Sequence, residues 1–295
     1  MFQNTNKTCI ITGGNAGIGK ETAKRMVNAN YNVIIACRGD DAAVQAAIQE
    51  IETATNKPGS VRSLKLDLSS QESIKSFVNT FLETNTPLDT LINNAGLYGP
   101  PYSKTKDGLE MQFGVNHIGP FLLTNLLLPK LSQSSEPRVV VVGSRAHNMA
   151  GGLDFDNLSV DEKGYSPIKY YNKSKLCNLL FTYELNRRLQ EKKSNITVNV
   201  IHPGVVQTNL FKNLNPAVLF VMKLGSLFFT TVETSADAVS NLAIGKDPAL
   251  KDVKGQYFSL KDKVASSRYS LETSNWSKLW EKSCAIVGIP QDIQL

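Results

Sequence analysis

The amino-acid sequence predicts an α/β fold in which a parallel sheet of about seven strands is covered by helices on both faces. Apolar runs alternate with longer helical segments along the chain, the runs are apolar at consecutive positions, and a glycine-rich turn follows the first. Consecutive apolar residues indicate strands buried on both sides, and right-handed crossovers give a doubly wound sheet. Because ligands bind such sheets at the carboxyl ends of the strands, polar residues just after each strand are the candidate functional residues.

The strands are expected at seven places along the chain. They are residues 8–12, 32–37, 61–66, 88–94, 138–144, 196–202 and 255–260. No linker, repeat or low-complexity tract divides the 295 residues, so we expect a single domain over 1–295. Its cofactor half is expected at about 1–145 and its catalytic and substrate half at about 146–295.

The composition excludes several classes of protein. The N-terminus is polar and no apolar stretch reaches the roughly 18 residues of a membrane span, so neither a signal peptide nor a transmembrane helix is expected. Four scattered cysteines indicate reduced thiols, and three scattered histidines indicate no metal site. The net charge of +6 is spread among acids, which favours a solvated surface over a nucleic-acid face. We therefore expect a cytoplasmic protein without nucleic-acid partners.

The first strand leads into the turn that organises the prediction. Glycines stand at Gly13, Gly14, Gly17 and Gly19, and the helix-forming series KETAKRMV follows. Glycines let backbone N–H groups approach a phosphate, and the next helix offers its positive N-terminal end. The absence of G-K-[ST] excludes the nucleotide P-loop. The turn thus favours a pyrophosphate site, with a plain structural turn as the alternative.

The second and third strands end at candidate cofactor contacts. Cys37 and Arg38 follow the second strand where an acid would bind a ribose hydroxyl, whereas an arginine accepts a 2′-phosphate. This favours NADP over NAD, and the alternative is an exposed strand-end arginine. Asp40 and Asp41 could instead cap the next helix. Asp67 and Leu68 follow the third strand, placed to touch the adenine edge.

The fourth strand is followed by small residues and then by an apolar helix. Asn93-Asn94-Ala95-Gly96 would let the backbone pass close to a cofactor, although an ordinary loop is the alternative. Residues 111–128 predict a long buried helix that contains one awkward polar residue, Asn116. A buried amide must be hydrogen-bonded, so Asn116 either caps a local kink or supports an active-site water.

The fifth strand ends at Ser144, and a further helix carries two more candidates. Ser166 and Pro167 predict its N-cap and first turn. Tyr171 and Lys175 are four residues apart and so share one face of this helix. A lysine beside a phenol lowers a pKa that is ordinarily about 10. Tyr171 is therefore predicted to act as a general acid near neutral pH.

Together these residues resemble the short-chain dehydrogenase/reductase family. TGGNAGIG, NNAG, Asn116, Ser144 and Tyr171-x-x-x-Lys175 occur in the family's order. The segments ACR, DGLEMQFGVNHIGPFLLTNLLLP, YNKSKLCNLLFTYELNRRL, HPGVVQTNL and the C-terminal GQYFSLKD resemble its retinol dehydrogenase-like branch. That branch includes the oxidoreductase domain joined to WW domains. The cysteine of the related light-dependent protochlorophyllide reductases is absent near NNAG, which counts against their photochemistry.

The resemblance implies a Rossmann-type domain that binds NADP(H), and it implies the role of each site residue. Tyr171 donates a proton to a substrate carbonyl, and Lys175 lowers the tyrosine pKa and holds the nicotinamide ribose. Ser144 hydrogen-bonds the carbonyl oxygen, and Asn116 fixes a water in the proton relay. The implied cofactor-binding residues are Gly13, Asn15, Gly17, Ile18, Gly19, Arg38, Asp67, Leu68, Asn94, Ala95, Gly96, Tyr171, Lys175, Pro203, Gly204, Val206 and Thr208.

Two departures from the branch bear on the substrate. Gly143 stands where the branch often has a second serine, and the hydrophobic N-terminal anchor of many retinol dehydrogenases is missing. Residues 216–229 are apolar apart from Lys223 and are expected to cover the substrate. This segment could be a packed helix, a wall for a lipophilic substrate, or a peripheral contact with membrane or lipid.

The sequence thus predicts an NADP(H)-dependent oxidoreductase that reduces a lipophilic, retinal-like aldehyde or ketone. One alternative is a non-catalytic NADP-binding sensor or scaffold that has kept the fold. Another is a lipid-alcohol dehydrogenase that works in the oxidative direction. The expected partner is a small apolar carbonyl or alcohol, and the chain is expected to be a monomer or a homodimer.

Overall fold

A single sheet forms the centre of the structure, a computed structural model that describes residues 2, 6–39, 42–206 and 230–295. The strand order is β3-β2-β1-β4-β5-β6-β7-β8, and all neighbours are parallel except β7 and β8. The strands are β1 (Lys7–Thr12), β2 (Tyr31–Cys37), β3 (Val61–Lys65), β4 (Thr90–Asn93), β5 (Arg138–Val142), β6 (Thr197–His202), β7 (Tyr257–Ser259) and β8 (Asp262–Lys263). The predicted doubly wound α/β architecture is confirmed.

The eighth strand is the one difference from the predicted sheet. The chain turns back after β7 at Leu260, which has a φ of 54°, and β8 pairs antiparallel along the edge. Both residues of β8 are exposed and charged. A two-residue polar strand carries no apolar pattern, so the sequence could not reveal it.

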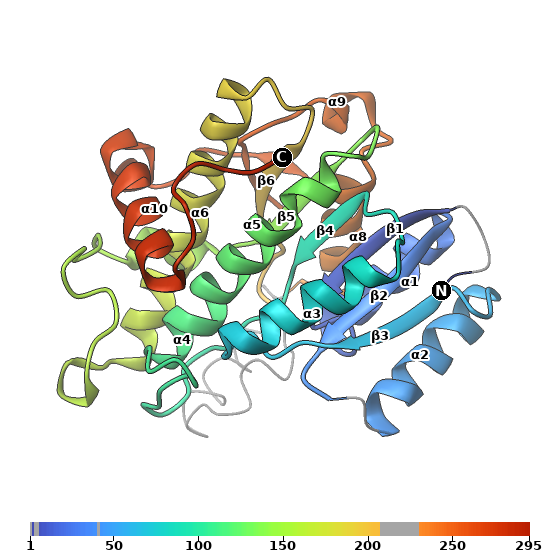
Figure 1. Cartoon of the computed structure of the whole chain (residues 1–295), viewed down its shortest axis with the longest axis horizontal. Coiled ribbons are helices and arrows are strands. Elements are labelled where there is room, and N and C mark those ends of the chain that lie inside the picture. Colours follow the sequence, from blue (N-terminus) through green and yellow to red (C-terminus); the bar gives the residue numbers. More distant parts are fainter. Residues whose placement is uncertain (1, 3–5, 40–41, 207–229) are drawn as a thin grey trace.

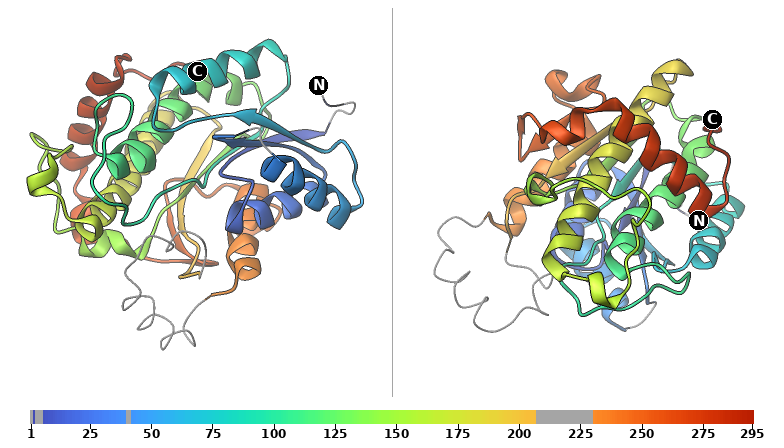
Figure 2. Two further views of the ribbon diagram at one scale, coloured as in Figure 1. Left: turned by 90° about the horizontal axis from the view of Figure 1, so that it is seen from below. Right: turned by 90° about the vertical axis from the view of Figure 1, so that its left-hand side faces the viewer.

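Helices cover both faces of the sheet, as Figures 1 and 2 show. One face packs against α1, α2 and α8, and the other packs against α3, α5 and α6. The helix α10 lies outside α5 and α6, where Trp280 packs edge-on against Phe121 with ring centroids 4.9 Å apart. These helices are α1 (Gly17–Asn28), α2 (Ala42–Thr55), α3 (Gln71–Glu83), α5 (Gly119–Leu131), α6 (Pro167–Glu191), α8 (Val232–Ile244) and α10 (Thr273–Val287).

Short helical segments occupy the connections between these elements. Within the described residues, two are α-helical and four have other helical geometry. They are α4 (Met111–Phe113), α9 (Pro248–Lys251), the π-helical turn η1 (Gly114–Ile118), and the 3₁₀ turns η2 (Arg145–Met149), η3 (Glu162–Gly164) and η6 (Arg268–Leu271).

The predicted helix over 111–128 is present, but a π-helical turn interrupts it. The segments α4, η1 and α5 follow one another without a gap, and Asn116 lies within η1. A π turn inserts one residue into a helix and often occurs at functional sites. The apolar pattern does not reveal such an insertion, because the residues on either side remain buried.

The start of α6 agrees with the prediction in position but not in detail. Ser166 occupies the N-cap with extended backbone angles, and Pro167 is the first helical residue. The Ser166 side chain makes no capping hydrogen bond. The proline, whose φ is already helical, is therefore the local feature that starts this helix.

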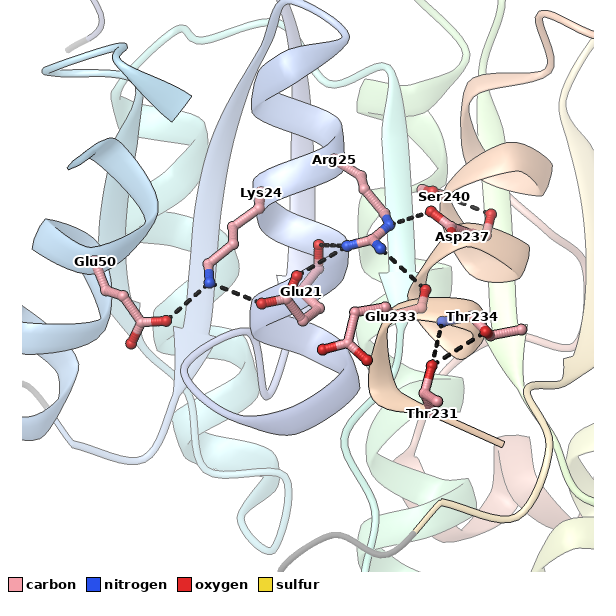
Figure 3. Close-up of polar contacts among 9 residues, drawn as sticks. All are labelled: Glu21, Lys24, Arg25, Glu50, Thr231, Glu233, Thr234, Asp237 and Ser240. Atoms are coloured by element: carbon pink, nitrogen blue, oxygen red, sulfur yellow. Dashed lines mark hydrogen bonds and ion pairs between the residues drawn. The ribbon is translucent and has the colours of Figure 1, made fainter. Parts of the chain in front are cut away.

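An ion-pair network joins α1, which follows the glycine turn, to α8 (Figure 3). Arg25 of α1 pairs with Asp237 of α8 and donates to the Glu233 carbonyl oxygen at 3.1 Å. It also pairs with Glu21 at 2.9 Å, and Lys24 bridges Glu21 and Glu50. The network therefore links α2, α1 and α8 at their surface, and packing of their buried faces against the sheet positions these helices.

No described helix is long and apolar enough to cross a membrane. No cluster of three or more potential metal ligands occurs within the ranges that the structure describes. All four cysteines are buried thiols, and none of them forms a disulfide.

Candidate active site

Thr12, the last residue of β1, joins the glycine-rich turn to the loop after β4. Its hydroxyl oxygen accepts hydrogen bonds from the backbone N–H groups of Asn94 and Ala95, both at 2.9 Å. Its carbonyl oxygen accepts from Asn94 Nδ2 at 2.9 Å. The strand order reverses between β1 and β4. Ligands of doubly wound sheets bind at the carboxyl ends of the strands at this point. The two predicted cofactor motifs are thus brought together at that point.

The glycine-rich turn has the geometry of a phosphate cradle. Gly13 and Gly17 have positive φ values of 66° and 52°, which favour glycine. A Cβ on Gly19 would overlap the Gly13 carbonyl oxygen and lie 2.6 Å from Asn94 Nδ2. The N-cap of α1 is Ala16, which makes no side-chain capping bond to the first turn. The amides at this helix end can therefore bind an anionic group, and the turn fits a pyrophosphate.

Tyr171, Ser144 and Lys175 meet at the carboxyl end of β5. The Ser144 side chain interacts with the Tyr171 phenol. Lys175 Nζ lies 5.7 Å from the centroid of the Tyr171 ring and donates to the Val142 carbonyl oxygen at 2.9 Å. Ser144 caps η2 by accepting from the Ala146 N–H at 3.1 Å. The predicted phenol, hydroxyl and amine therefore converge on one point.

The prediction that Lys175 lowers the pKa of Tyr171 is wrong for this structure. Burial raises the pKa of the Tyr171 phenol to about 12, and the interaction with Ser144 opposes that rise only in part. Burial also lowers the pKa of Lys175 to about 8. Desolvation disfavours the charged form of both groups. The sequence shows the spacing of the pair but not its burial.

Asn116 is buried and hydrogen-bonded, as expected of a buried amide. Its Oδ1 accepts from the Leu97 N–H at 2.7 Å, and its Nδ2 donates to the Leu97 carbonyl oxygen and to Ser174 Oγ, both at 2.9 Å. A Cβ on Gly96 would lie 3.2 Å from Asn116 Oδ1 and 3.7 Å from Lys175 Nζ. Asn116 therefore joins the loop after β4 to α6 beside Lys175.

The candidates after β2 and β3 lie at the same edge of the sheet. Arg38 is exposed at the end of β2 and makes no ion pair within the described part of the chain. Asp67 accepts from the N–H and hydroxyl of Ser69 at 3.0 and 2.7 Å, and Lys106 pairs with it at 3.1 Å. Leu68 is buried against Gly119. The side chain of Asp67 is thus already engaged in a local turn and an ion pair.

Comparisons with known proteins agree with this geometry. A family model described as short chain dehydrogenase matches residues 7–155. Short-chain dehydrogenase TIC 32 A, chloroplastic, from Brassica napus is 41% identical over 289 residues, covering 95% of this chain and 88% of that protein. Retinol dehydrogenase 14 from Homo sapiens is 40% identical over 298 residues, covering 96% and 87%. The chain belongs to the short-chain dehydrogenase family.

Within this family the chain falls in the retinol dehydrogenase-like branch, because retinol dehydrogenases 11, 13 and 14 from Homo sapiens are each 40–41% identical to it. The fold is also shared with a solved structure of an uncharacterised protein from Mycobacterium paratuberculosis. That structure has a TM-score of 0.75 and 31% identity, and the similarity covers 98% of this chain and 95% of that one.

One departure from this branch of the short-chain dehydrogenases has a structural counterpart. A Cβ on Gly143, where the branch often has a serine, would lie 2.7 Å from Val200 Cγ2 on the neighbouring β6. The Val200 methyl group occupies the space that a side chain at position 143 would need, so a glycine at 143 fits beside a valine at 200.

The loop after β6 brings further predicted cofactor contacts of the short-chain dehydrogenase site to this edge. The Pro203 carbonyl oxygen accepts from Ser235 Oγ at 2.5 Å, and Gly204 has a φ of 90° and packs directly against Thr230. Val206 is buried. Asn15 and Ile18 are partly buried in the glycine turn. Four other predictions, concerning Asp40, Asp41, Thr208 and residues 216–229, lie outside the described residues.

The sequence did not reveal His147, although it stands three residues after Ser144. Its Nε2 accepts from the Ser267 N–H at 3.1 Å, so its Nδ1–H donates to the Ser144 carbonyl oxygen at 2.7 Å. Burial lowers the pKa of His147, which favours this neutral tautomer. A histidine that contacts the active site only through backbone atoms has no sequence signature. Thr12 escaped notice for the same reason.

Proposed function

We propose that the protein is an NADP(H)-dependent reductase of lipophilic aldehydes or ketones. The observation that carries the proposal is the buried Tyr171 phenol, which interacts with Ser144 and has Lys175 beside its ring. A carbonyl oxygen that accepted from both hydroxyls would gain negative charge during reduction. Donors already aimed at that oxygen stabilise the transition state.

The protonation state of Tyr171 supports the reductive direction. With a pKa of about 12, the phenol keeps its proton throughout the neutral range. Reduction requires the proton to be given to the forming alkoxide, whereas oxidation requires a base that has already lost it. A protonated Tyr171 is therefore the form that the proposed reduction requires.

The residues present fit a nicotinamide dinucleotide. Its pyrophosphate would lie on the glycine cradle before α1, and its ribose would be held by Lys175 Nζ near Gly96. When bound, the cofactor supplies the hydride. The protein's own residues orient the carbonyl through Ser144, provide the proton at Tyr171 Oη and exclude water by burial.

Arg38 carries the proposed preference for NADP(H). We expect Arg38→Ala to raise the KM for NADPH roughly 10- to 100-fold and to leave the KM for NADH nearly unchanged. The reason is that a charge-assisted hydrogen bond to a phosphate contributes about 1.5–3 kcal/mol. The measurement is initial rates with each cofactor. Arg62→Ala, an exposed arginine on the adjacent β3, serves as the control. Equal KM changes for both cofactors would refute the assignment of Arg38.

Lys175 should give the reaction an alkaline limit. Its pKa of about 8 lies below the ordinary lysine value, so the amine is charged below pH 8 and neutral above it. We expect kcat/KM for NADPH, which reports the free enzyme, to fall about tenfold per pH unit above that pKa. The measurement is a profile of kcat/KM from neutral to alkaline pH. A flat profile to two units above the pKa would contradict a role for the charged amine.

The substrate class is proposed from the relatives, several of which are named retinol dehydrogenases. We therefore expect turnover of retinal, medium-chain aldehydes, steroids or quinones with NADPH. Activity confined to small polar carbonyls in a panel of both kinds would overturn the lipophilic assignment. A cytoplasmic location and a monomeric or homodimeric state stay predictions.

The second candidate function is a non-catalytic NADP-binding sensor or scaffold. Cofactor binding without turnover of any carbonyl or alcohol would favour it. The convergence of Ser144, Tyr171 and Lys175 argues against it, because a binding protein does not need a buried phenol beside a buried amine.

A further inference from the structure

The loop from Leu97 to Pro100 follows the Asn93-Asn94-Ala95-Gly96 stretch and lies against the start of α6. Asn116 binds both backbone polar groups of Leu97 and extends to Ser174 on α6. Ser174 Oγ in turn donates to the Tyr171 carbonyl oxygen at 2.8 Å. One end of the loop is therefore joined by hydrogen bonds to the helical turn that carries the phenol.

Gln112 makes the same kind of connection at the other end of the loop. This fully buried side chain accepts from the Gly99 N–H at 2.9 Å and donates to the Pro167 carbonyl oxygen at 2.8 Å. It also donates to the Tyr165 hydroxyl at 2.9 Å, which donates to the Pro100 carbonyl oxygen at 2.7 Å. Burying an amide is costly unless it is hydrogen-bonded, and these bonds go to the loop and the start of α6.

Tyr98 lies between these two anchored residues. Its ring packs edge-on against the ring of Tyr171, with centroids 4.5 Å apart and an interplanar angle of 77°. This is a favourable geometry for two aromatic rings. Because Leu97 and Gly99 are both hydrogen-bonded to buried amides, the backbone on either side of Tyr98 is held in place against α6.

We propose that Tyr98 is a positioning residue that holds the Tyr171 ring in the orientation required for proton transfer, and that Gln112 acts through Tyr98. The role in turnover rests on the proposed function, whereas the restraint on the ring does not. Tyr98 itself does not transfer the proton. A phenol that can tilt by a fraction of an ångström away from the carbonyl oxygen loses the alignment that positioned acid catalysis needs.

The test uses the full chain and a matched pair of tyrosines. Tyr98 and Tyr102 are both partly buried near this loop, but Tyr102 packs against Tyr165, at 5.5 Å, and not against Tyr171. We expect Tyr98→Ala to lower kcat roughly 10- to 100-fold with an unchanged KM for NADPH. Tyr102→Ala should stay within about threefold of the wild type, and Tyr98→Phe, which keeps the ring, should retain most activity.

A second arm reads the ring directly. With ring-¹³C-labelled tyrosine, the Tyr171 resonances are assigned by their loss in Tyr171→Phe. We expect them to shift, and the ring to flip faster, in Tyr98→Ala and in Gln112→Met but not in Tyr102→Ala. Combining Tyr98→Ala with Gln112→Met should lower kcat no further than Tyr98→Ala alone.

The outcomes separate this inference from the proposed function. Unchanged Tyr171 resonances in Tyr98→Ala, or equal kcat losses in Tyr98→Ala and Tyr102→Ala, would overturn the positioning role even if the enzyme is an active reductase. A wild type without turnover would refute the proposed function. The Tyr171 ring resonances would then decide by themselves whether Tyr98 restrains the Tyr171 ring. Thermal unfolding of each variant checks that it is folded.

Discussion

Tyr171→Phe is expected to lower carbonyl turnover by about 10²- to 10⁴-fold, the usual contribution of a positioned general acid. The substitution keeps the ring, its packing against Tyr98 and the burial of the site, and it removes only the phenol hydroxyl, which interacts with Ser144. The loss should therefore fall on kcat, with NADPH affinity nearly unchanged. Steady-state kinetics with a responsive carbonyl, together with NADPH fluorescence titration, measures both quantities.

A matched control for this variant is Tyr183→Phe. Tyr183 lies on the same helix, is also buried, and donates to Ser266 Oγ at 2.8 Å, away from Ser144. Its substitution should leave kcat within about threefold, because a single neutral hydrogen bond contributes only about 0.5–1.5 kcal/mol to stability. If Tyr171→Phe kept wild-type turnover, Tyr171 would not be the acid.

Gly19→Ala is expected to abolish most of the affinity for NADPH. The added Cβ would overlap the Gly13 carbonyl oxygen and crowd Asn94 Nδ2 at 2.6 Å, so the turn itself must shift. Overpacking of this kind costs about 1–3 kcal/mol, which corresponds to a loss of roughly 5- to 150-fold in affinity if the shift distorts the cradle. The measurement is NADPH titration of each purified variant.

Gly14→Ala provides the comparison within the same turn. A Cβ there would approach its nearest neighbours, Ile11 and Ile35, only to 3.3 Å. Affinity should fall no more than a few-fold, because shifts of a few tenths of an ångström at the Ile11 carbonyl oxygen and the Ile35 side chain relieve these contacts, whereas a Cβ on Gly19 would overlap the backbone outright. Equal affinities in the two variants would show that the close approach of Gly19 to Gly13 does not shape the cofactor site.

The fold could be predicted from the sequence because its strands are apolar on both sides. Every residue of β2 is buried, and Asn32 is its one strongly polar residue. The strand therefore shows as an almost unbroken apolar run in the sequence. The exposed pair in β8 and the π turn around Asn116 left no such pattern. Both are defined by backbone hydrogen bonds, and the periodicity of apolar residues does not reveal these bonds.

The site was predictable where its chemistry needs a residue type at a fixed spacing. Tyr171 and Lys175 share a helix face, and Ser144 lies two residues after β5, so topology alone brings them close. Tyr98, Gln112 and the connections they make could not be found in this way, since they depend on tertiary packing. The direction of the Tyr171 pKa shift was missed for the same reason, because burial outweighs the effect expected from Lys175.

The central claim, that this chain reduces a carbonyl with NADPH, is tested most directly by following the hydride. The purified protein is incubated with NADPH deuterated at the transferable position and a panel of lipophilic aldehydes and ketones, and the products are analysed by mass spectrometry. We predict an alcohol that carries one deuterium at the former carbonyl carbon, formed by the wild type and not by Tyr171→Phe. Tight NADPH binding with no deuterium in any product would contradict the claim and favour the non-catalytic binding protein.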